Sequence, residues 1–338
     1  MAEISVIIPV HNSRDYLAQC VESLLNQTFT DFEILLMENF STDGTYEIAQ
    51  SLAEKDSRIR LFKLDKKGIC NARNEGIEKA LGKYIVFMDN DDLVTEDHLQ
   101  ALYDCVSDGS CQMGIAPFAG LYSQGKVKKK IYHFPQGVYT DGSKACLMGE
   151  RVVWSRIYSR QIINDNHVRF DDRVEAVEDW PFYFRMLLLS QGVKVTDKSC
   201  YYYRQGRQGQ ASAGSSLKSL KKNFLAVSLI KDMILNHPQG EIYKPYYHRE
   251  LAHEIIGKTF AATGLKKLTP DEVGEIIEPL KDQLLSIRLN NDICESWLVT
   301  WFGYFQYWLK KGFYRRFFKF MRLYKNIIIQ PFKIKLKK

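Results

Sequence analysis

The chain has 338 residues, 45% hydrophobic and 26% charged, a composition typical of folded proteins that excludes disordered, collagen-like and disulfide-scaffold classes. Its formal net charge is +7, yet residues 296–338 hold eleven basic residues and no acid. The first 295 residues therefore carry 36 basic and 40 acidic side chains, so the positive excess belongs to the C-terminal segment.

The first hundred residues alternate short β-branched runs with amphipathic segments, a pattern that predicts βαβ units and a largely parallel sheet. The expected strands are residues 4–8 (closed by Pro9), 32–37, 59–64 and 84–88. The expected helices are residues 13–25 with Ser13 as N-cap, a second opened by Thr42-Asp43-Gly44, and residues 69–81 ended by a left-handed Gly82. Residues 84–88 are apolar on both faces, which indicates a central buried strand.

The middle of the chain predicts an extension of the sheet, with a helix after Thr95. Strand-like segments are residues 112–121 and 126–134, helices are expected near 143–148 and over 178–190, and residues 152–158 are ambiguous. The Gly-, Gln- and Ser-rich residues 206–216 predict a flexible loop. Residues 217–236, 247–262 and 271–285 follow as helical stretches. We expect three parts: an α/β domain (1–215), a helical region (216–295) and a basic aromatic tail (296–338).

Three carboxylates follow the buried strand 84–88 directly, in the sequence Asp89-Asn90-Asp91-Asp92. Ligands of parallel α/β sheets bind outside the carboxyl ends of strands, so this is where chemistry is expected. Because the carboxylates repel one another, the cluster favours a hard cation, and Mg²⁺ or Mn²⁺ is commonly held by one or two carboxylates plus phosphate oxygens. A metal diphosphate is the implied ligand. The alternative is that Asp91 and Asp92 only begin the next loop and helix.

Two further loops are expected on the same edge of the sheet. Pro9-Val10-His11-Asn12 follows the first strand, and Glu38-Asn39 with residues 40–44 follows the second. The Asn39 amide can pair with a base edge, and Arg73 with Asn74 can reach the same edge. Taken singly, Arg73 is better explained as a solvated helix residue and residues 41–43 as a helix cap. The chain has no G-x-G-x-x-G or Walker sequence.

These motifs, in this order and together with Glu178-Asp179-Trp180, resemble family 2 glycosyltransferases over roughly residues 3–205. The resemblance implies a GT-A fold, a Rossmann-like mixed sheet, and inverting transfer of a sugar from a nucleotide diphosphate, with UDP favoured. It implies that Asp91, together with Asp89, holds Mn²⁺ or Mg²⁺, that Asp89 also contacts the ribose or sugar of the donor, and that Asp92 supports the site. The nucleotide-sugar contacts would fall on Pro9, His11, Asn12, Glu38, Asn39, Arg73, Asn74, Asp89 and Asn90, with His11, Asn39 and Arg73 at the nucleobase.

Two departures from the family pattern alter this assignment. Glu38-Asn39 stands where relatives commonly have Asp-Asp, so an amide replaces the acidic base contact. Relatives often place a His shortly after a Tyr-Arg pair, whereas Tyr203-Arg204 is followed here by Gln205, Gly206 and Arg207. Arg204 or Arg207 could hold the diphosphate instead, since guanidinium binds phosphate oxygens bidentately.

An inverting displacement needs a base to accept the proton of the acceptor hydroxyl. Glu178-Asp179-Trp180-Pro181 begins a predicted helix, where an acid could simply favour the helix dipole. The resemblance places the base at this pair, with Asp179 first and Glu178 second. Trp180 could line the acceptor site by stacking on a sugar, although a Trp in a helix is more often part of the core.

The C-terminal segment interleaves aromatic and basic residues, as in Trp308, Lys310, Lys311 and Phe313. Trp and Tyr favour the headgroup level of a membrane, and cations gain about 1 kcal/mol each near anionic lipids. We expect peripheral attachment to an anionic membrane at its cytoplasmic face, rather than nucleic acid binding; the alternative is that the aromatic face packs on the protein. The longest uncharged apolar stretch, residues 296–309, is shorter than the roughly 20 residues of a spanning helix.

The remaining features agree with a cytoplasmic protein. The seven cysteines form no CxxC pair, which predicts free thiols, and no signal peptide is evident. We therefore expect a metal-dependent glycosyltransferase of surface polysaccharide assembly acting on a saccharide or lipid-linked acceptor. The alternatives are a noncatalytic membrane-attached saccharide-binding or scaffold protein, and a sugar nucleotidyltransferase, although the latter should show a Gly-rich loop after the first strand.

Overall fold

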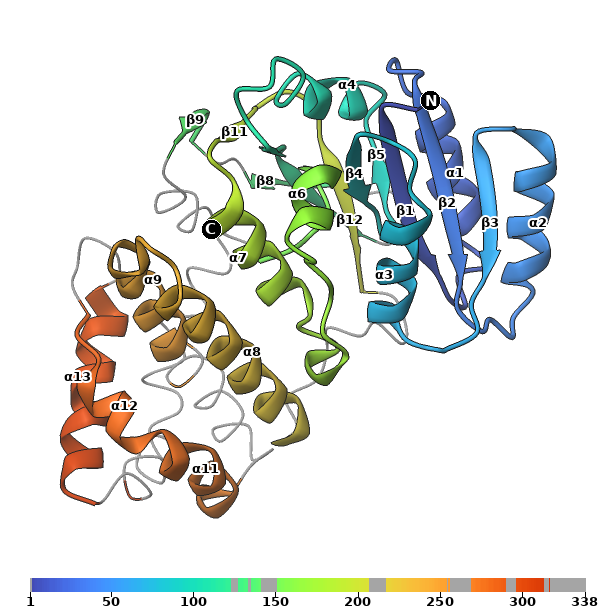
Figure 1. Cartoon of the computed structure of the whole chain (residues 1–338). Helices are drawn as coiled ribbons and strands as arrows, with labels where there is room; N and C mark the ends of the chain where they lie inside the picture. The colour runs from blue at the N-terminus through green and yellow to red at the C-terminus, as the bar shows by residue number, and fades with distance from the viewer. Residues whose placement is uncertain are drawn as a thin grey trace. The chain divides into compact units, whose positions relative to one another are not determined.

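The computed structural model describes residues 2–122, 127–132, 135–140, 151–206, 217–253, 255, 269–289, 296–312 and 316. The chain forms two compact units, Met1–Gln210 and Ala211–Lys338 (Figure 1). The first is a mixed α/β fold, as predicted, and the described part of the second is helical. The helix expected near residues 143–148, the loop over 207–216 and most of the chain beyond Gly312 lie outside the described residues.

An eight-stranded sheet forms the centre of the first unit, in the order β3-β2-β1-β4-β10-β6-β11-β9 (Figure 1). Its strands are β1 (Ile4–Val10), β2 (Phe32–Glu38), β3 (Ile59–Lys63), β4 (Tyr84–Phe87), β6 (Met113–Ile115), β9 (Gly137–Tyr139), β10 (Arg156–Ser159) and β11 (Val193–Val195). Strands β1 to β4 pair in parallel, whereas β10 is antiparallel to β4 and β6. The carboxyl ends of β1, β2 and β4 therefore lie at the same edge of the sheet.

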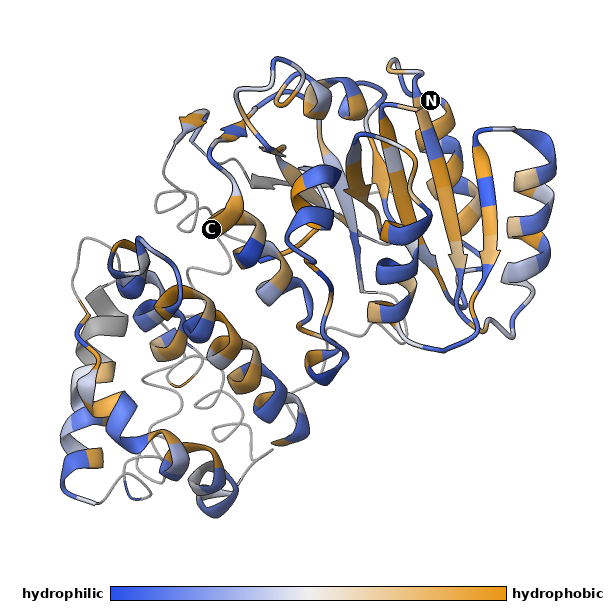
Figure 2. Cartoon of the chain, viewed as in Figure 1, coloured by the Kyte–Doolittle hydropathy of each residue, from blue (hydrophilic) through white to orange (hydrophobic). Residues whose placement is uncertain are grey.

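Helices cover both faces of the sheet because successive strand side chains point to opposite sides. Ile4, Val6 and Ile8 share a core with α1 (Leu17–Leu25), α2 (Thr45–Lys55) and α4 (His98–Tyr103). Ile7 and Phe87 share the other core with α3 (Ile69–Lys79), α6 (Arg160–Asp165) and α7 (Asp179–Leu189). Figure 2 shows β1 and β2 as strongly hydrophobic strands between these layers.

Helix α3 lies close to β1 at Gly76. A Cβ atom built on Gly76 would lie 2.4 Å from Cγ2 of Ile7, far inside van der Waals contact. The glycine is needed for this close approach of helix and strand.

A second, four-stranded sheet has the order β5-β12-β7-β8. Its strands are β5 (Leu93–Val94), β7 (Phe118–Tyr122), β8 (Val127–Tyr132) and β12 (Tyr201–Gln205). Since β4 ends in the large sheet at Phe87 and β5 begins at Leu93, the aspartates lie on the segment that crosses between the sheets. Trp154 forms a bridge to Phe87 and stacks on the ring of Tyr201.

Strand β1 is longer than predicted, because it continues through Pro9 to Val10. Its pairing with β2 covers the whole strand, but its pairing with β4 stops at Ile7. Ile7 accepts a hydrogen bond from Met88 on the β4 side, and Pro9 faces the same side beyond the last β4 pair. The next ladder bond on that side would need an N–H at Pro9, so the pairing of β1 with β4 ends there.

Two predicted helix ends are wrong. Helix α1 begins at Leu17, and the carbonyl of Ser13 accepts the turn bonds of Tyr16 and Leu17 while no side chain caps the helix. Helix α3 ends at Lys79, before Gly82, and Gly82 does not have a positive φ. A Cβ atom at Gly82 would lie 2.6 Å from the backbone nitrogen of Ser5, so close packing explains this glycine.

The second unit contains helices α8 (Leu217–Leu235), α9 (Gly240–His253), α11 (Pro270–Ile277), α12 (Lys281–Ser286) and α13 (Ser296–Lys310). The single helix expected over residues 271–285 is interrupted by a 3₁₀ turn, Glu278–Leu280, at Pro279. Gln306 of α13 donates hydrogen bonds to the carbonyls of Leu284 and Ile287, so the first part of the expected tail packs with the helical region. None of the described helices is long and apolar enough to cross a membrane.

Candidate active site

Arg73 joins three carboxylates from two separate segments at the carboxyl edge of the sheet. One terminal nitrogen donates to Oε1 of Glu178 at 2.8 Å and to Oδ1 of Asp179 at 2.6 Å. The other donates to Oδ1 of Asp89 at 3.3 Å. The side chain of Arg73 is only 3% exposed, and its guanidinium lies over the ring of Phe170 at 5.1 Å. We call Arg73, Asp89, Glu178 and Asp179 the arginine junction.

The acidic pair stands at the start of α7, as the sequence predicts, with Glu178 at the N-cap. Glu178 also accepts a hydrogen bond from the backbone N–H of Ala176 at 2.6 Å, and Asp179 accepts one from Val153 at 3.4 Å. Burial raises the pKa of Asp179 to about 7, although Arg73 lowers it and Glu178 raises it further. With a side chain that is 17% exposed, Asp179 combines access to solvent with the pKa of a general base.

The segment 89–92 after β4, which we call the aspartate turn, is held in place by strand β12. Asp92 is fully buried, and its carboxylate accepts hydrogen bonds from the hydroxyl of Tyr201 at 2.6 Å and from the backbone N–H of Arg204 at 2.7 Å. Arg204 also donates from Nε to the carbonyl of Asp91 at 2.7 Å. Burial raises the pKa of Asp92 well above its ordinary value, and the nearby Asp89 and Asp91 raise it further.

The loops after β1 and β2 hold each other in place. The Oδ1 atom of Asn12 accepts from the backbone N–H of Thr42 at 2.9 Å, and the Asn12 N–H donates to Oγ of Ser41 at 3.2 Å. Glu38 is buried and accepts from the N–H of Ser41 at 2.6 Å. These contacts support the expectation that the two loops share one edge of the sheet.

Asn39 connects this edge to the start of α3, since its Oδ1 accepts from the N–H of Gly68 at 2.9 Å. Asn39 is buried at the end of β2, and Nδ1 of His11 is buried without a hydrogen-bond partner among the described residues. Pro9 and Asn90 are also buried beside the strand ends.

The prediction for Asn74 needs correction. Its amide nitrogen donates to the carbonyl of Phe170 at 2.9 Å, and its oxygen accepts from the Phe170 N–H at 2.8 Å. Asn74 therefore fixes the segment that carries Phe170 and does not present its amide to a nucleobase. Arg73 is also placed differently from the expectation, because its terminal nitrogens bind carboxylates.

Trp180 is buried in α7, and the guanidinium of Arg151 lies 3.8 Å from the centre of its ring. A cation thus covers the ring that the sequence assigned to the acceptor. Arg207 lies outside the described residues.

The described residues contain no group of three or more His, Cys, Asp or Glu side chains arranged to hold a metal ion. A divalent cation bound by Asp89 and Asp91 would need oxygen ligands from another source, and a diphosphate supplies them. The carboxylate donor set fits Mg²⁺ or Mn²⁺. The five described cysteines are free and buried.

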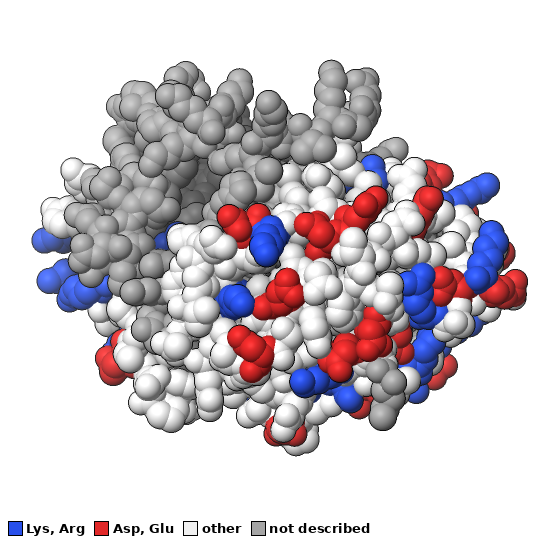
Figure 3. Space-filling model, turned by 90° about the horizontal axis from the view of Figure 1, so that it is seen from above, with Lys and Arg blue, Asp and Glu red and all other residues white. Residues whose placement is uncertain are grey.

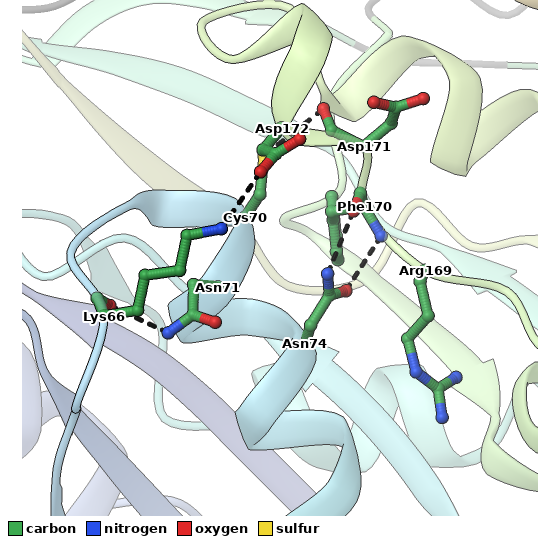
Figure 4. Close-up of a pocket in the computed structure, with 8 residues that line it drawn as sticks. All are labelled: Lys66, Cys70, Asn71, Asn74, Arg169, Phe170, Asp171 and Asp172. Atoms are coloured by element: carbon green, nitrogen blue, oxygen red, sulfur yellow. Dashed lines mark hydrogen bonds and ion pairs between the residues drawn. The ribbon is translucent and has the colours of Figure 1, made fainter.

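A polar pocket of about 410 Å³ lies beside α3 (Figure 4). It is lined by Lys66, Cys70, Asn71, Asn74, Arg169, Phe170, Asp171 and Asp172. Some of its polar groups bond to one another, as Lys66 does to Asp172 at 3.2 Å and Asn74 to the backbone of Phe170, whereas Arg169 pairs with Glu78 and Asp171 with Arg173 outside the pocket. Arg73 is not among the lining residues, so this pocket differs from the arginine junction.

Charges elsewhere on the first unit are mixed. On the face drawn in Figure 3, acidic and basic side chains are interspersed among uncharged residues. The described residues on that face form no continuous basic patch.

Sequence reasoning missed three residues that build the site. Phe170 covers Arg73 and stacks on Phe182 at 4.1 Å, Tyr201 braces the aspartate turn, and Glu175 accepts from the N–H of Ile69 at 3.3 Å. The run Tyr201-Tyr202-Tyr203 before Arg204 was the available signal for a buried tyrosine at this strand.

The aspartate turn, the acidic pair and the two braced loops agree with one family. Residues 5–166 match the sequence profile described as "Glycosyl transferase family 2". These residues form a family 2 glycosyltransferase domain. The expectation from the motifs is thereby confirmed.

Relatives and solved structures of this family cover different shares of the chain. The "Uncharacterized glycosyltransferase EpsJ" of Bacillus subtilis is 31% identical over 213 residues, 60% of this chain and 61% of EpsJ. The "Poly(ribitol-phosphate) beta-N-acetylglucosaminyltransferase TarS" of Staphylococcus aureus is 24% identical over 77% of this chain and 45% of TarS. The chain thus spans about half to three fifths of the length of these relatives.

The fold is that of a solved glycosyltransferase. The crystal structure of a TarS fragment from S. aureus in complex with UDP-GlcNAc superimposes with a TM-score of 0.76, covering 96% of this chain and 92% of the fragment at 19% identity. The same fragment in complex with UDP gives a TM-score of 0.74. The GT-A fold predicted from the motifs is confirmed.

Proposed function

We propose that the chain transfers a sugar from a UDP-sugar to a hydroxyl of a saccharide or lipid-linked acceptor during surface polysaccharide assembly. The arginine junction is the observation that supports this most. It brings Asp89, at the edge where a donor binds, and Asp179, a base with a pKa near 7, to one guanidinium. The relatives add support: TarS carries an N-acetylglucosaminyltransferase name, and its fragment was solved with UDP-GlcNAc.

In the proposed reaction the acceptor hydroxyl attacks the anomeric carbon from the face opposite the diphosphate. The new oxygen–carbon bond forms as the bond to the diphosphate breaks, so the configuration inverts and UDP leaves with the bonding electrons. The carboxylate of Asp179 takes the hydroxyl proton. Glu178 shares Arg73 with Asp179 and positions it.

The donor diphosphate would lie against the aspartate turn. Asp91 and Asp89 would hold Mg²⁺ or Mn²⁺, which would offset the negative charge on the departing diphosphate. Arg204 is held by its bond to the Asp91 carbonyl and lies 4.9 Å over the ring of Tyr16. Its guanidinium would help to bind the diphosphate. His11 and Asn39 would contact the uracil, and the Gly68 bond sets the orientation of the Asn39 amide.

Helix α13 supports peripheral attachment to a membrane. Phe302, Phe305 and Leu309 are buried within the protein, whereas Tyr304 and Tyr307 are exposed and Lys310 and Lys311 follow on the surface. Helix α13 contacts α9 and α12 of the same unit, and the buried set is the part of its aromatic face that this packing covers. The exposed tyrosines and lysines remain available to lipid headgroups. Equal sedimentation with anionic vesicles by the full chain and by a chain ending at residue 295 would contradict this proposal.

The enzyme is tested with a panel of UDP-sugars read by release of UDP. Release from one donor, greater with a suitable saccharide acceptor, is expected and separates an enzyme from a scaffold protein. Binding of UDP without release from any donor–acceptor pair would favour the noncatalytic alternative. Release of diphosphate from a sugar phosphate and UTP would indicate a nucleotidyltransferase.

A further inference from the structure

Strand β12 contacts the aspartate turn through the hydroxyl of Tyr201 and the backbone N–H of Arg204. The hydroxyl of Tyr201 accepts a hydrogen bond from the N–H of Asp89 at 3.2 Å and donates one to Oδ2 of Asp92 at 2.6 Å. The backbone N–H of Arg204 donates to the other carboxylate oxygen of Asp92, Oδ1, at 2.7 Å. Tyr201 lies 112 residues beyond Asp89, so these bonds are a tertiary contact between two sheets.

We propose that Tyr201, acting through Asp92, is a positioning residue for donor binding that sets the places of the Asp89 and Asp91 carboxylates. The proposal rests on the proposed function of this site. We call the bonds among Tyr201, Asp92, Arg204 and the turn the β12 clasp.

The turn itself does not need a buried carboxylate. Its own closing bond runs between backbone groups, from the N–H of Asp92 to the carbonyl of Asp89 at 3.2 Å. A buried carboxylate is costly unless its oxygens are bonded, and both oxygens of Asp92 are bonded to β12. The Asp92 side chain therefore links the turn to β12 and does not stabilise the turn itself.

The hydroxyl of Tyr201 is itself held in one place. The ring stacks on Trp154 with 4.6 Å between centroids and 14° between planes, and the residue is buried. Because the ring cannot shift, the two hydrogen bonds of the hydroxyl fix the Asp89 backbone and the Asp92 side chain relative to β12. Asp89 and Asp91 repel each other, so a turn released from the clasp would relax away from the geometry that binds a donor.

The base is held by different groups, which makes the role of the clasp separable. Arg73 and the N–H of Val153 bind Asp179, and neither belongs to β12. Arg73 also bonds Asp89 at 3.3 Å, so loss of the Tyr201 hydroxyl should weaken donor binding more than it slows the chemical step.

The test compares Tyr201→Phe with Tyr84→Phe. Tyr84 is a buried tyrosine on β4 whose hydroxyl donates to the carbonyl of Val106 at 3.0 Å, so it controls for the loss of a buried hydroxyl remote from the turn. UDP binding is measured by calorimetry with Mn²⁺ on the full chain, together with the melting temperature, kcat and the KM for the donor. Tyr201→Phe should weaken UDP binding and raise KM by about tenfold while kcat changes by less than about threefold. Tyr84→Phe should lower the melting temperature alone.

Asp92→Asn tests the same β12 clasp, because the amide cannot accept the hydrogen bonds of both the Tyr201 hydroxyl and the Arg204 N–H. If Tyr201→Phe does not fold, Asp92→Asn takes its place in the test. Together the two substitutions should weaken UDP binding little more than the worse of them. UDP binding by Tyr201→Phe within about twofold of the unmodified chain overturns the proposal, since coupled residues should show more. Failure of the unmodified chain to bind UDP would instead overturn the proposed function on which the clasp depends.

Discussion

Replacing Asp179 by Asn tests the central assignment of the site. The amide keeps the shape of the side chain but cannot accept the proton of the acceptor hydroxyl. We expect kcat to fall by about 10²- to 10⁴-fold, the usual contribution of a general base. UDP affinity should hardly change, since the proposed nucleotide contacts lie elsewhere. Turnover is measured by UDP release with saturating donor and acceptor.

The pH dependence gives a second measure of the same residue. Burial raises the pKa of Asp179 to about 7, and a base must be ionised to act, so activity should rise with pH. About one tenth of Asp179 is ionised at pH 6 and about nine tenths at pH 8, so kcat/KM should increase roughly tenfold across this interval. This acidic limb of the pH profile should be measured in kcat/KM, because kcat/KM reports the pKa values of the free enzyme.

Asp172→Asn is the matched control. Its carboxylate is exposed and pairs only weakly with Lys66, at 3.2 Å, so the same chemical change should leave activity within about twofold. Near-normal turnover of Asp179→Asn, or a flat kcat/KM between pH 6 and pH 8, would refute the assignment of Asp179 as the base.

Three further outcomes are expected. EDTA should abolish UDP release and Mn²⁺ or Mg²⁺ should restore it; activity indifferent to chelation would remove Asp91 from its role. Arg73→Gln should lower the melting temperature, since it leaves three carboxylates without their buried cation, and should shift the acidic limb of kcat/KM to higher pH; an unmoved limb would separate Arg73 from the base. His98 is buried and its pKa is lowered to about 4, chiefly by desolvation, so stability is present above pH 6.5 and is lost as the pH falls toward 4, by about 3 kcal/mol in all. The His98→Leu protein should lack this part of the pH dependence of the melting temperature.

Local periodicity and the order of the motifs were enough to predict the parallel half of the sheet. Residues 84–88 are apolar on both faces, and the structure has β4 there between β1 and β10. The meeting of Arg73 and Asp179 at one site with Asp89 could be expected only through the family resemblance. Short sequence patterns cannot show it, because 106 residues separate Arg73 from Asp179.

The errors come from tertiary contacts that short patterns do not encode. Ser13 has the chemistry of a helix cap, but the chain makes another turn before α1 begins at Leu17. Asn74 has the chemistry of a nucleobase contact, but the backbone of Phe170 takes both of its amide atoms. Tyr201 showed only an aromatic strand, since its partners Asp89 and Asp92 are more than a hundred residues away.

Gly76 has no side chain and stands outside the site, yet it limits which sequences can support catalysis. Its contact with Ile7 sets the distance of α3 from β1, and Arg73 lies three residues earlier on the same helix. A methyl group at residue 76 would push the helix outward and carry the guanidinium away from its carboxylates. Screening for variants with altered donor preference should therefore keep residue 76 fixed and vary the loops instead, because a change at residue 76 would move the catalytic charges before it altered any contact with substrate.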